Sequence, residues 1–168
     1  KDFRITSTLD DTYKNGIFKL TMDIRNTGSQ TSKDYIIGYK VFDPKTNKVI
    51  AESEKNSAFN ANSTISLFGH TEIEIPDVKT WTSEHPNLYK LLMYIKDGEK
   101  IVEMVPFNIG FRRIEIKPIE QKAANGQPYV CLFINGQPLK LKGVNIHEHN
   151  PATGHYVPED LMRRDFEL

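Results

Sequence analysis

The chain has 168 residues and a mass of 19.3 kDa, and its 22 Lys and Arg residues balance 22 Asp and Glu residues. This zero balance argues against a nucleic-acid or membrane-surface protein, because both partners need a basic surplus on the protein. The single cysteine, Cys131, excludes an internal disulfide and any metal site built from several cysteines. The length suits one domain, or one domain with a piece of another.

Residues 1 to about 110 have the pattern of an antiparallel β-sandwich. Apolar and polar residues alternate most clearly in residues 18–25, 35–41 and 89–95, and this period of two places one face of a strand on a core. Turn signals separate the runs, among them Asn15-Gly16 and Asp97-Gly98. We expect roughly seven short strands, the count typical of such sandwiches. Residues 51–64 are interpreted as an edge strand and a loop.

The pattern changes after Gly110. Alternating and apolar segments flank Asn135-Gly136, which predicts a second hairpin. A strand is expected over Leu139–Asn145 and a helix over Pro158–Leu168, since proline suits the first helical position. A strand, a long loop and a helix form the opening unit of an α/β protein. Because the sequence lacks an initial Met and ends inside the helical pattern, both ends are interpreted as cuts in a longer protein.

Three of the five histidines, His147, His149 and His155, lie in the loop between this strand and helix. The zinc motif HExxH fails here because Pro151 occupies the position of its second histidine. Three interpretations stay open: side chains that stabilise the loop, substrate contacts, and a metal bound by His147 and His149.

For the other single residues of interest, a structural role is expected in preference to a functional one. Trp81 is expected to cap the sandwich core, with a sugar-stacking platform as the alternative. Tyr89 is expected to tie a corner with its hydroxyl, and Cys131 to be a small buried apolar residue. His70 and His85 are assigned to loops. The acidic candidates form no catalytic pair; they are Glu148, Glu159 and Asp160.

Three segments, in order and at matching spacing, carry a resemblance to a known family. WTSEHPNLY (81–89) resembles the W-S-x-E-x-P-x-L-Y stretch of family 2 glycoside hydrolases, and NIGFRRIEI (108–116) resembles their G-F-R-x-I-E-I junction. FINGQPLKLKGVN (133–145) resembles the L-x-N-G-K-P-x-x-x-x-G-V-N segment with which their barrel begins.

The resemblance implies an immunoglobulin-like sandwich in residues 1–112 and the start of a catalytic (β/α)8 barrel in residues 113–168. The fold class is thus all-β with a strand–loop–helix piece of a barrel. Lys140 and Lys142 fit poorly, since a strand buried on both faces is continuously apolar.

Within the family, HEH (147–149) followed by Pro151 is most similar to β-galactosidases, whose usual G-V-N-R-H-E-H has an Arg where this chain has Ile146. The resemblance implies a substrate-binding role for His147, with Asn145 and His149 as weaker candidates. It implies a retaining mechanism on terminal β-galactosides or other β-linked glycans. Both catalytic glutamates are expected downstream of Leu168 and are thus absent from this chain. A magnesium site of the parent protein would also lie mainly downstream.

The rival interpretation is a free-standing sandwich that binds carbohydrate or a protein partner. A homo-oligomeric parent, located in a bacterial periplasm or cytoplasm, is compatible with the sequence, and no residue decides the compartment. Residues 139–168 are expected to be mobile, exchanged with another copy or packed unlike the family, because a lone barrel unit exposes an apolar face.

Overall fold

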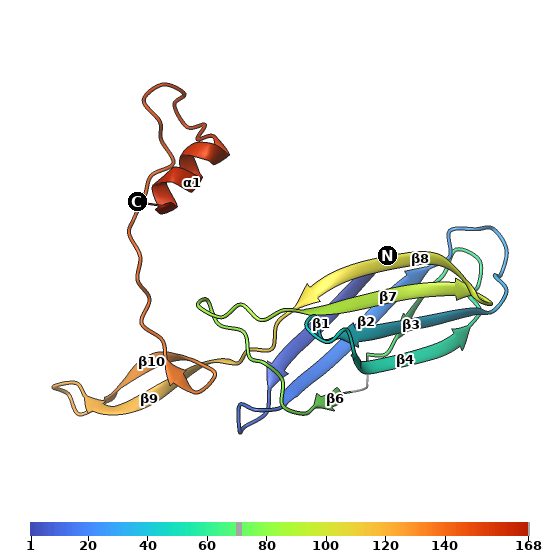
Figure 1. Cartoon of the computed structure of the whole chain (residues 1–168), viewed down its shortest axis with the longest axis horizontal. Helices are drawn as coiled ribbons and strands as arrows, with labels where there is room; N and C mark the ends of the chain where they lie inside the picture. The colour runs from blue at the N-terminus through green and yellow to red at the C-terminus, as the bar shows by residue number, and fades with distance from the viewer. Residues whose placement is uncertain (70–71, 168) are drawn as a thin grey trace.

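The computed structural model describes residues 1–69 and 72–167, and it consists of a β-sandwich, a hairpin and a C-terminal tail (Figure 1). The predicted loop residue His70 lies outside the described residues. The elements are β1 (Asp2–Leu9), β2 (Gly16–Arg25), β3 (Tyr35–Phe42), β4 (Val49–Ser57), β5 (Thr64–Leu67), β6 (Glu72–Ile75), β7 (Tyr89–Asp97), β8 (Lys100–Ile109), β9 (Ile114–Lys122), β10 (Pro128–Ile134), β11 (Gln137–Pro138) and α1 (Glu159–Glu167).

Two antiparallel sheets form the sandwich, one in the order β1-β2-β5 and the other in the order β4-β3-β7-β8. Strand β6 also pairs with β2. Because β5 pairs with one half of β2 and β6 with the other, they act as one interrupted strand. The predicted immunoglobulin-like sandwich of about seven strands is confirmed, as is the edge strand at residues 51–57.

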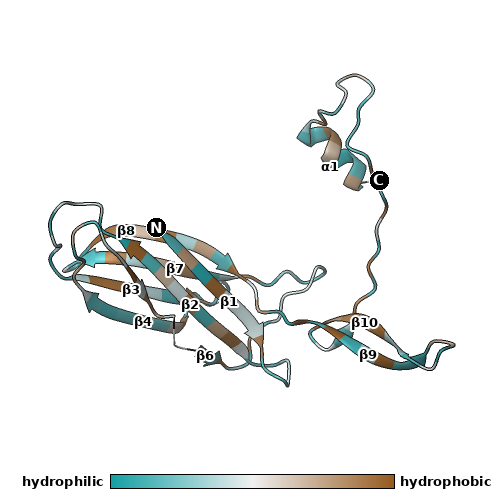
Figure 2. Cartoon of the chain, turned by 180° about the vertical axis from the view of Figure 1, so that it is seen from behind, coloured by the Kyte–Doolittle hydropathy of each residue, from teal (hydrophilic) through white to brown (hydrophobic). Residues whose placement is uncertain are grey.

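The core lies between the two sheets and follows the period-two alternation. Strand β2 buries Phe18 and Leu20, and β3 buries Ile37 and Val41 on the facing layer. Figure 2 shows the same alternation of apolar and polar residues along these strands. Aromatic edges meet in the core, with the Tyr39 ring centroid 5.6 Å from that of Phe18 and 5.2 Å from that of Phe68. Such pairs add stability beyond the area that they bury.

Tyr89 ties a corner of the sandwich, as predicted. Its ring is buried, and its hydroxyl accepts a hydrogen bond of 2.8 Å from the backbone N–H of Lys79. Burial raises the pKa of the Tyr89 hydroxyl, so it stays neutral and remains able to donate as well as accept.

The connection between β1 and β2 differs from the tight Asn15-Gly16 turn expected. Gly16 is the first residue of β2, and the loop residue with a left-handed backbone is Tyr13, with φ of 59°. Gly16 is needed for space instead, since a Cβ on it would lie 2.7 Å from the Phe111 ring. Gly16 therefore marks the start of β2, but it is required by the packing of Phe111 and not by a turn.

The predicted second hairpin is confirmed. Asn135 and Gly136, with φ of 49° and 77°, join β10 to β11, and these two strands pair antiparallel. This pair of left-handed residues is the backbone that Asn-Gly favours in two-residue hairpin turns. Strands β9 and β10 also pair antiparallel, through a turn of their own in which the Ala123 N–H donates to the Gln127 carbonyl oxygen.

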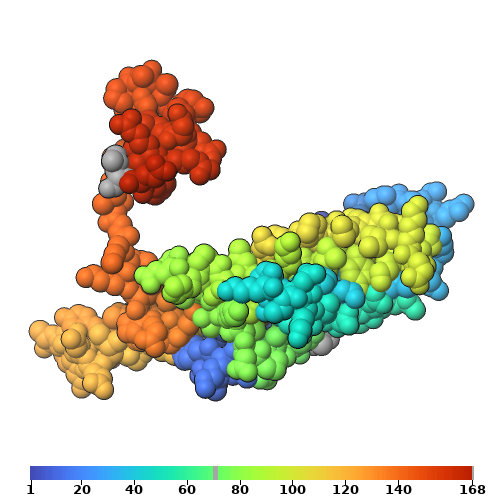
Figure 3. Space-filling view, in the orientation of Figure 1, coloured from blue at the N-terminus to red at the C-terminus, as the bar shows by residue number. Residues whose placement is uncertain are grey.

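The strand predicted over Leu139–Asn145 is wrong in this structure: residues 139–149 run without helix or strand assignment. A strand needs a neighbour for its backbone hydrogen bonds, and the ladders recorded for the described residues end at Pro138. The tail stands apart from the sandwich (Figure 3).

Helix α1 confirms the helix predicted over Pro158–Leu168, with a small difference at each end. It begins at Glu159 rather than Pro158, and the Pro158 carbonyl oxygen accepts from the N–H of Met162 at 3.1 Å. Pro158 is thus the residue just before the first turn. At the other end the helix is described as far as Glu167, and Leu168 lies outside the described residues.

Strand β8 is one of the two edges of its sheet, opposite β4, and is unusually apolar for an edge. Met104 and Phe107 are 53% and 46% exposed. Pro106 lies opposite Leu92 of β7, and the register shifts between Ile95 and Lys96. Proline is tolerated in sheets where the absent N–H would face solvent, so this edge lacks one donor.

Candidate functional site

The histidine loop and helix α1 enclose a hollow in the tail. His147 and His149 line a cavity of about 530 Å³, and the apolar face of α1 lines its other side with Leu161, Met162 and Phe166. The amphipathic pattern of the helix explains this arrangement, because residues four positions apart, such as Met162 and Phe166, share one helical face.

The loop is shaped by contacts among its own residues. The backbone N–H of His149 donates to the carbonyl oxygen of His147 at 2.7 Å. The ring of His149 packs edge-on against the ring of His155, with centroids 5.2 Å apart. Both histidines are solvent-exposed, so their imidazoles are free to exchange partners with a ligand.

The structure brings two of the three predicted site residues together. His147 and His149 share the hollow, whereas Asn145 is exposed and is not among its lining residues. Asp165 also lines the hollow and was not singled out from the sequence. The signal was available, because Asp165 follows Leu161 by four residues and therefore lies on the same face of α1.

Of the acidic candidates, Glu148 lines the hollow, whereas Glu159 and Asp160 belong to the first turn of α1. The Glu159 carboxylate accepts a 2.6 Å hydrogen bond from the Arg163 guanidinium one turn later. Among the described residues, no cluster of three or more His, Cys, Asp or Glu side chains has the geometry to hold a metal ion. The structure thus gives the metal interpretation of His147 and His149 no third ligand within residues 1–69 and 72–167.

Trp81 lies at the end of the sandwich and does not belong to the buried core, contrary to the expectation of a core cap. The Arg112 guanidinium lies over its ring at 4.4 Å from the centroid. Its backbone N–H donates to the Phe111 carbonyl oxygen at 2.8 Å, and its own carbonyl oxygen accepts from the Asn135 side chain at 3.1 Å. The cation on its ring gives Trp81 a role at the end of the sandwich rather than that of an open platform for sugar stacking.

Cys131 is half-buried on β10 rather than fully buried as expected. The hairpin is a single layer of β9 and β10, extended by the two-residue β11. Its residues contribute nothing to the described core cluster, which ends along the chain at Phe111. A residue of such a hairpin has too few neighbours for full burial.

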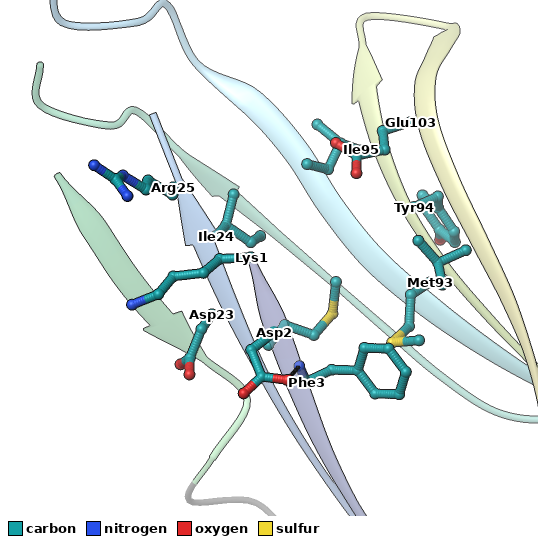
Figure 4. A pocket seen from close by; sticks show the side chains of 12 residues that line it. Lys1, Asp2, Phe3, Asp23, Ile24, Arg25, Met93, Tyr94, Ile95 and Glu103 are labelled. Carbon is teal, nitrogen blue, oxygen red and sulfur yellow. Dashed lines mark hydrogen bonds between the residues drawn. The ribbon is translucent and has the colours of Figure 1, made fainter. Parts of the chain in front are cut away.

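A second hollow, of about 280 Å³, opens between the two sheets beside the N-terminus (Figure 4). Met22, Ile24 and Met93 line its interior, and charged residues of both signs, including Asp23 and Glu103, surround its mouth. The apolar interior continues the core between β2 and β7, so this hollow is the open side of the sandwich.

The strongest pKa shift lies on the outer face of the sandwich, far along the chain from the histidine loop. Burial raises the pKa of Tyr94 well above its usual range, and its hydroxyl donates to Glu54 at 2.7 Å. Hydrogen bonds from Lys96 and Tyr94 lower the pKa of the Glu54 carboxyl. These groups connect β4 to β7 across β3, where Gly38 pairs with both Glu54 and Tyr94, and they stabilise the sheet.

Comparison with known proteins decides the family. The profile described as glycosyl hydrolases family 2 matches residues 1–112, and the profile of the TIM barrel domain of that family matches residues 129–168. The chain belongs to glycosyl hydrolases family 2.

Relatives in this family align with all or nearly all of the chain. A β-galactosidase of Pseudoalteromonas haloplanktis is 32% identical over 171 aligned residues, covering 100% of this chain and 15% of the relative. A β-galactosidase of Streptococcus thermophilus is 29% identical, covering 95% of this chain and 14% of the relative. The chain thus spans about 15% of the length of these family 2 enzymes.

Solved structures confirm the family 2 fold. The crystal structure of a Bacteroides uniformis β-glucuronidase superposes with a TM-score of 0.75 at 18% identity, over 98% of this chain and 18% of the other. A β-glucuronidase of Parabacteroides merdae with glycerol in its active site superposes with a TM-score of 0.70 at 22% identity, over 99% of this chain and 19% of the other.

No helix in the described part of the chain is long and apolar enough to cross a membrane.

Proposed function

We propose that this chain is the scaffold domain and barrel opening of a retaining glycosidase that removes terminal β-galactosyl residues. The observation that carries the proposal is the order of the two family profiles, sandwich first and barrel second, within one continuous match to β-galactosidases. The β-glucuronidase structures share the fold at 18–22% identity and do not bear on the sugar.

The division of labour follows from the two parts of the chain. We assign residues 1–112 to the sandwich domain and residues 113–168 to the opening of the barrel. A retaining mechanism needs two carboxyl groups about 5–5.5 Å apart, one as nucleophile and one as acid and base. We propose that both belong to the remainder of the barrel, downstream of Leu168, and that any magnesium ion of the parent protein is bound there as well.

His147 is the residue that we assign to substrate binding. Its exposed imidazole lines the hollow, and a neutral imidazole offers one donor and one acceptor to a sugar hydroxyl. In barrels of this type the loops after the strands form the catalytic face, which is where this loop would lie. His149 lines the same hollow, with its ring packed on His155. For Asn145, substrate binding is supported only by the resemblance to the family.

Two experiments test the proposal. The 168-residue chain, incubated with nitrophenyl β-galactoside, is expected to give no turnover above a mock purification. The protein encoded by the complete gene is expected to hydrolyse the galactoside in preference to the glucuronide.

In that complete protein, His147→Ala is expected to lower kcat/KM by about 10²-fold or more, as loss of a good polar contact to substrate does. The matched control is His155→Ala, which changes the neighbouring ring outside the hollow lining. Turnover by the 168-residue chain, preference for a glucuronide, or equal effects of the two substitutions would each contradict a part of the proposal.

A further inference from the structure

We propose that Tyr13 anchors a rigid joint between the sandwich and the hairpin β9–β10, so that the sandwich sets the direction in which the chain enters the barrel. The joint consists of Asp11, Tyr13, Arg113, Glu115 and Lys117. This inference concerns the mechanics of the chain and does not depend on the proposed function.

The hairpin has little else to hold it. The described core cluster contains no residue beyond Phe111, and outward-facing residues of the hairpin such as Ile116 and Val130 are 73% and 64% exposed. A two-stranded hairpin is marginally stable by itself in water. Its orientation therefore depends on a small number of specific contacts with the sandwich.

Tyr13 is held in an unusual conformation within its own loop. Its φ is 59°, a left-handed backbone that few non-glycine residues adopt. Its N–H donates to the Asp10 carbonyl oxygen at 3.2 Å, and the Asp10 carboxylate accepts from the N–H groups of Lys14 and Asn15. The loop thus fixes Tyr13 on both sides along the chain, and such strained positions in loops commonly serve a specific contact.

The Tyr13 hydroxyl connects directly to β9, about a hundred positions away. It donates to a Glu115 carboxylate oxygen at 2.7 Å and accepts from the Lys117 ammonium at 2.7 Å. Hydrogen bonds in which one partner is charged are stronger than those between neutral groups.

Arg113 closes the network from the other side. Its guanidinium bonds the Asp11 carboxylate at 2.6 Å and the Glu115 carboxylate at 3.1 Å. Arg113 and Lys117 both lie near the Tyr13 ring, 5.7 and 5.4 Å from its centroid. Acids and bases therefore alternate along the series Asp11, Arg113, Glu115 and Lys117. Such a network restricts the orientation of the hairpin more than a single exposed ion pair does.

Gly136 provides the space for the ring. A Cβ at this position would lie 2.6 Å from the Tyr13 ring, and the residue's φ of 77° also favours glycine. The preceding Asn135 accepts a 2.9 Å hydrogen bond from the Arg113 N–H and donates one of 3.1 Å to the Trp81 carbonyl oxygen. The Asn135-Gly136 turn that follows β10 is thus fitted to Tyr13 on one side and to Trp81 on the other.

The test is the relative orientation of the two parts in solution. Residual dipolar couplings of the 168-residue chain should fit one alignment tensor for the sandwich strands and for β9–β10 together. In Tyr13→Ala the couplings of the hairpin should no longer fit the tensor of the sandwich. Glu115→Ala, which leaves the sandwich sequence intact, should cause the same loss even if Tyr13→Ala fails to fold.

The matched control is Tyr129→Ala, because Tyr129 lies on the same hairpin, is 53% exposed and is outside the joint. It should keep the single tensor. The proposal is overturned if the unmodified chain already needs two tensors, or if Glu115→Ala keeps one. It is also overturned if Tyr129→Ala loses the common alignment as fully as Glu115→Ala does.

Discussion

Gly16 and Phe111 meet at the end of the sandwich from which the hairpin departs, and a Cβ on Gly16 would lie 2.7 Å from Cδ1 of the Phe111 ring and 2.9 Å from a methyl of Val78. The ring of Phe111 is fully buried, so it has no room to retreat. The G-F-R junction motif therefore contributes a core residue to the sandwich.

Gly16→Ala is expected to destabilise the sandwich by about 1–3 kcal/mol, the usual cost of overpacking a filled core. Urea unfolding followed by far-UV circular dichroism measures the change. The control is Gly143→Ala, where no atom lies within 4 Å of the added methyl group. Equal urea midpoints for Gly16→Ala and the unmodified chain would show that Phe111 and its neighbours can shift to accommodate the added methyl group.

Phe111→Ala is expected to cost about 3–5 kcal/mol, as truncation of a buried phenylalanine does. Phe166→Ala makes the same change at a ring that is 92% exposed and is expected to leave the urea midpoint unchanged. A similar loss in both variants would mean that the tail packs on the sandwich in solution.

Tyr89→Phe removes only the hydroxyl that accepts from the Lys79 N–H. The loss of this bond at a buried ring is expected to lower the free energy of unfolding by about 1 kcal/mol. Amide hydrogen exchange at Lys79 should quicken in the variant. Unchanged exchange at that amide would show that the corner is held by packing alone.

The joint should weaken in acid. Hydrogen bonds from Lys117 and Tyr13 lower the pKa of the Glu115 carboxyl, and the cation of Arg113 acts in the same direction. A carboxyl whose pKa is lower in the folded state stabilises that state above its unfolded pKa, and this contribution disappears as the pH falls through the folded value. Asp11 is the other acid of the joint and faces Arg113.

The common alignment of sandwich and hairpin should therefore persist at neutral pH and be lost only below the ordinary range of a glutamic acid. The carboxyl carbon shift of Glu115, followed by NMR over the same pH range, should change together with the couplings. Glu115→Gln should abolish this part of the pH dependence. A hairpin that stays aligned after Glu115 is protonated would argue against an electrostatic joint.

Local patterns in the sequence predicted the parts of the fold that are governed by neighbouring residues. The alternation in β2, β3 and β7 revealed their buried faces, because one side of each strand meets the core. The Asn135-Gly136 turn was predicted as well, since its backbone conformation favours those two residues.

Other features depend on contacts far along the chain and left no local signal. Gly16 resembled a turn glycine although its neighbour in space is Phe111. Tyr13 carries no motif, and its partners on β9 are about a hundred positions away. The strand expected over Leu139–Asn145 has the right composition, yet strand formation needs a pairing partner that composition does not supply. Of the candidate site, His147 and His149 were found from their clustering and Asp165 was missed.

Pro106 makes the free edge of β8 a poor template for a further strand. An incoming backbone would find one carbonyl unmatched where the proline offers no N–H, and the shift in register near Ile95 would misalign the rest. Aggregation by sheet extension is thereby discouraged in spite of the apolar side chains along this strand. Phe107 lies on the inner face of β8, where its ring packs against that of Phe3, and Met104 lies on the opposite face. Any neighbour that covers Met104 must therefore do so with its side chains, as a surface packed against a surface.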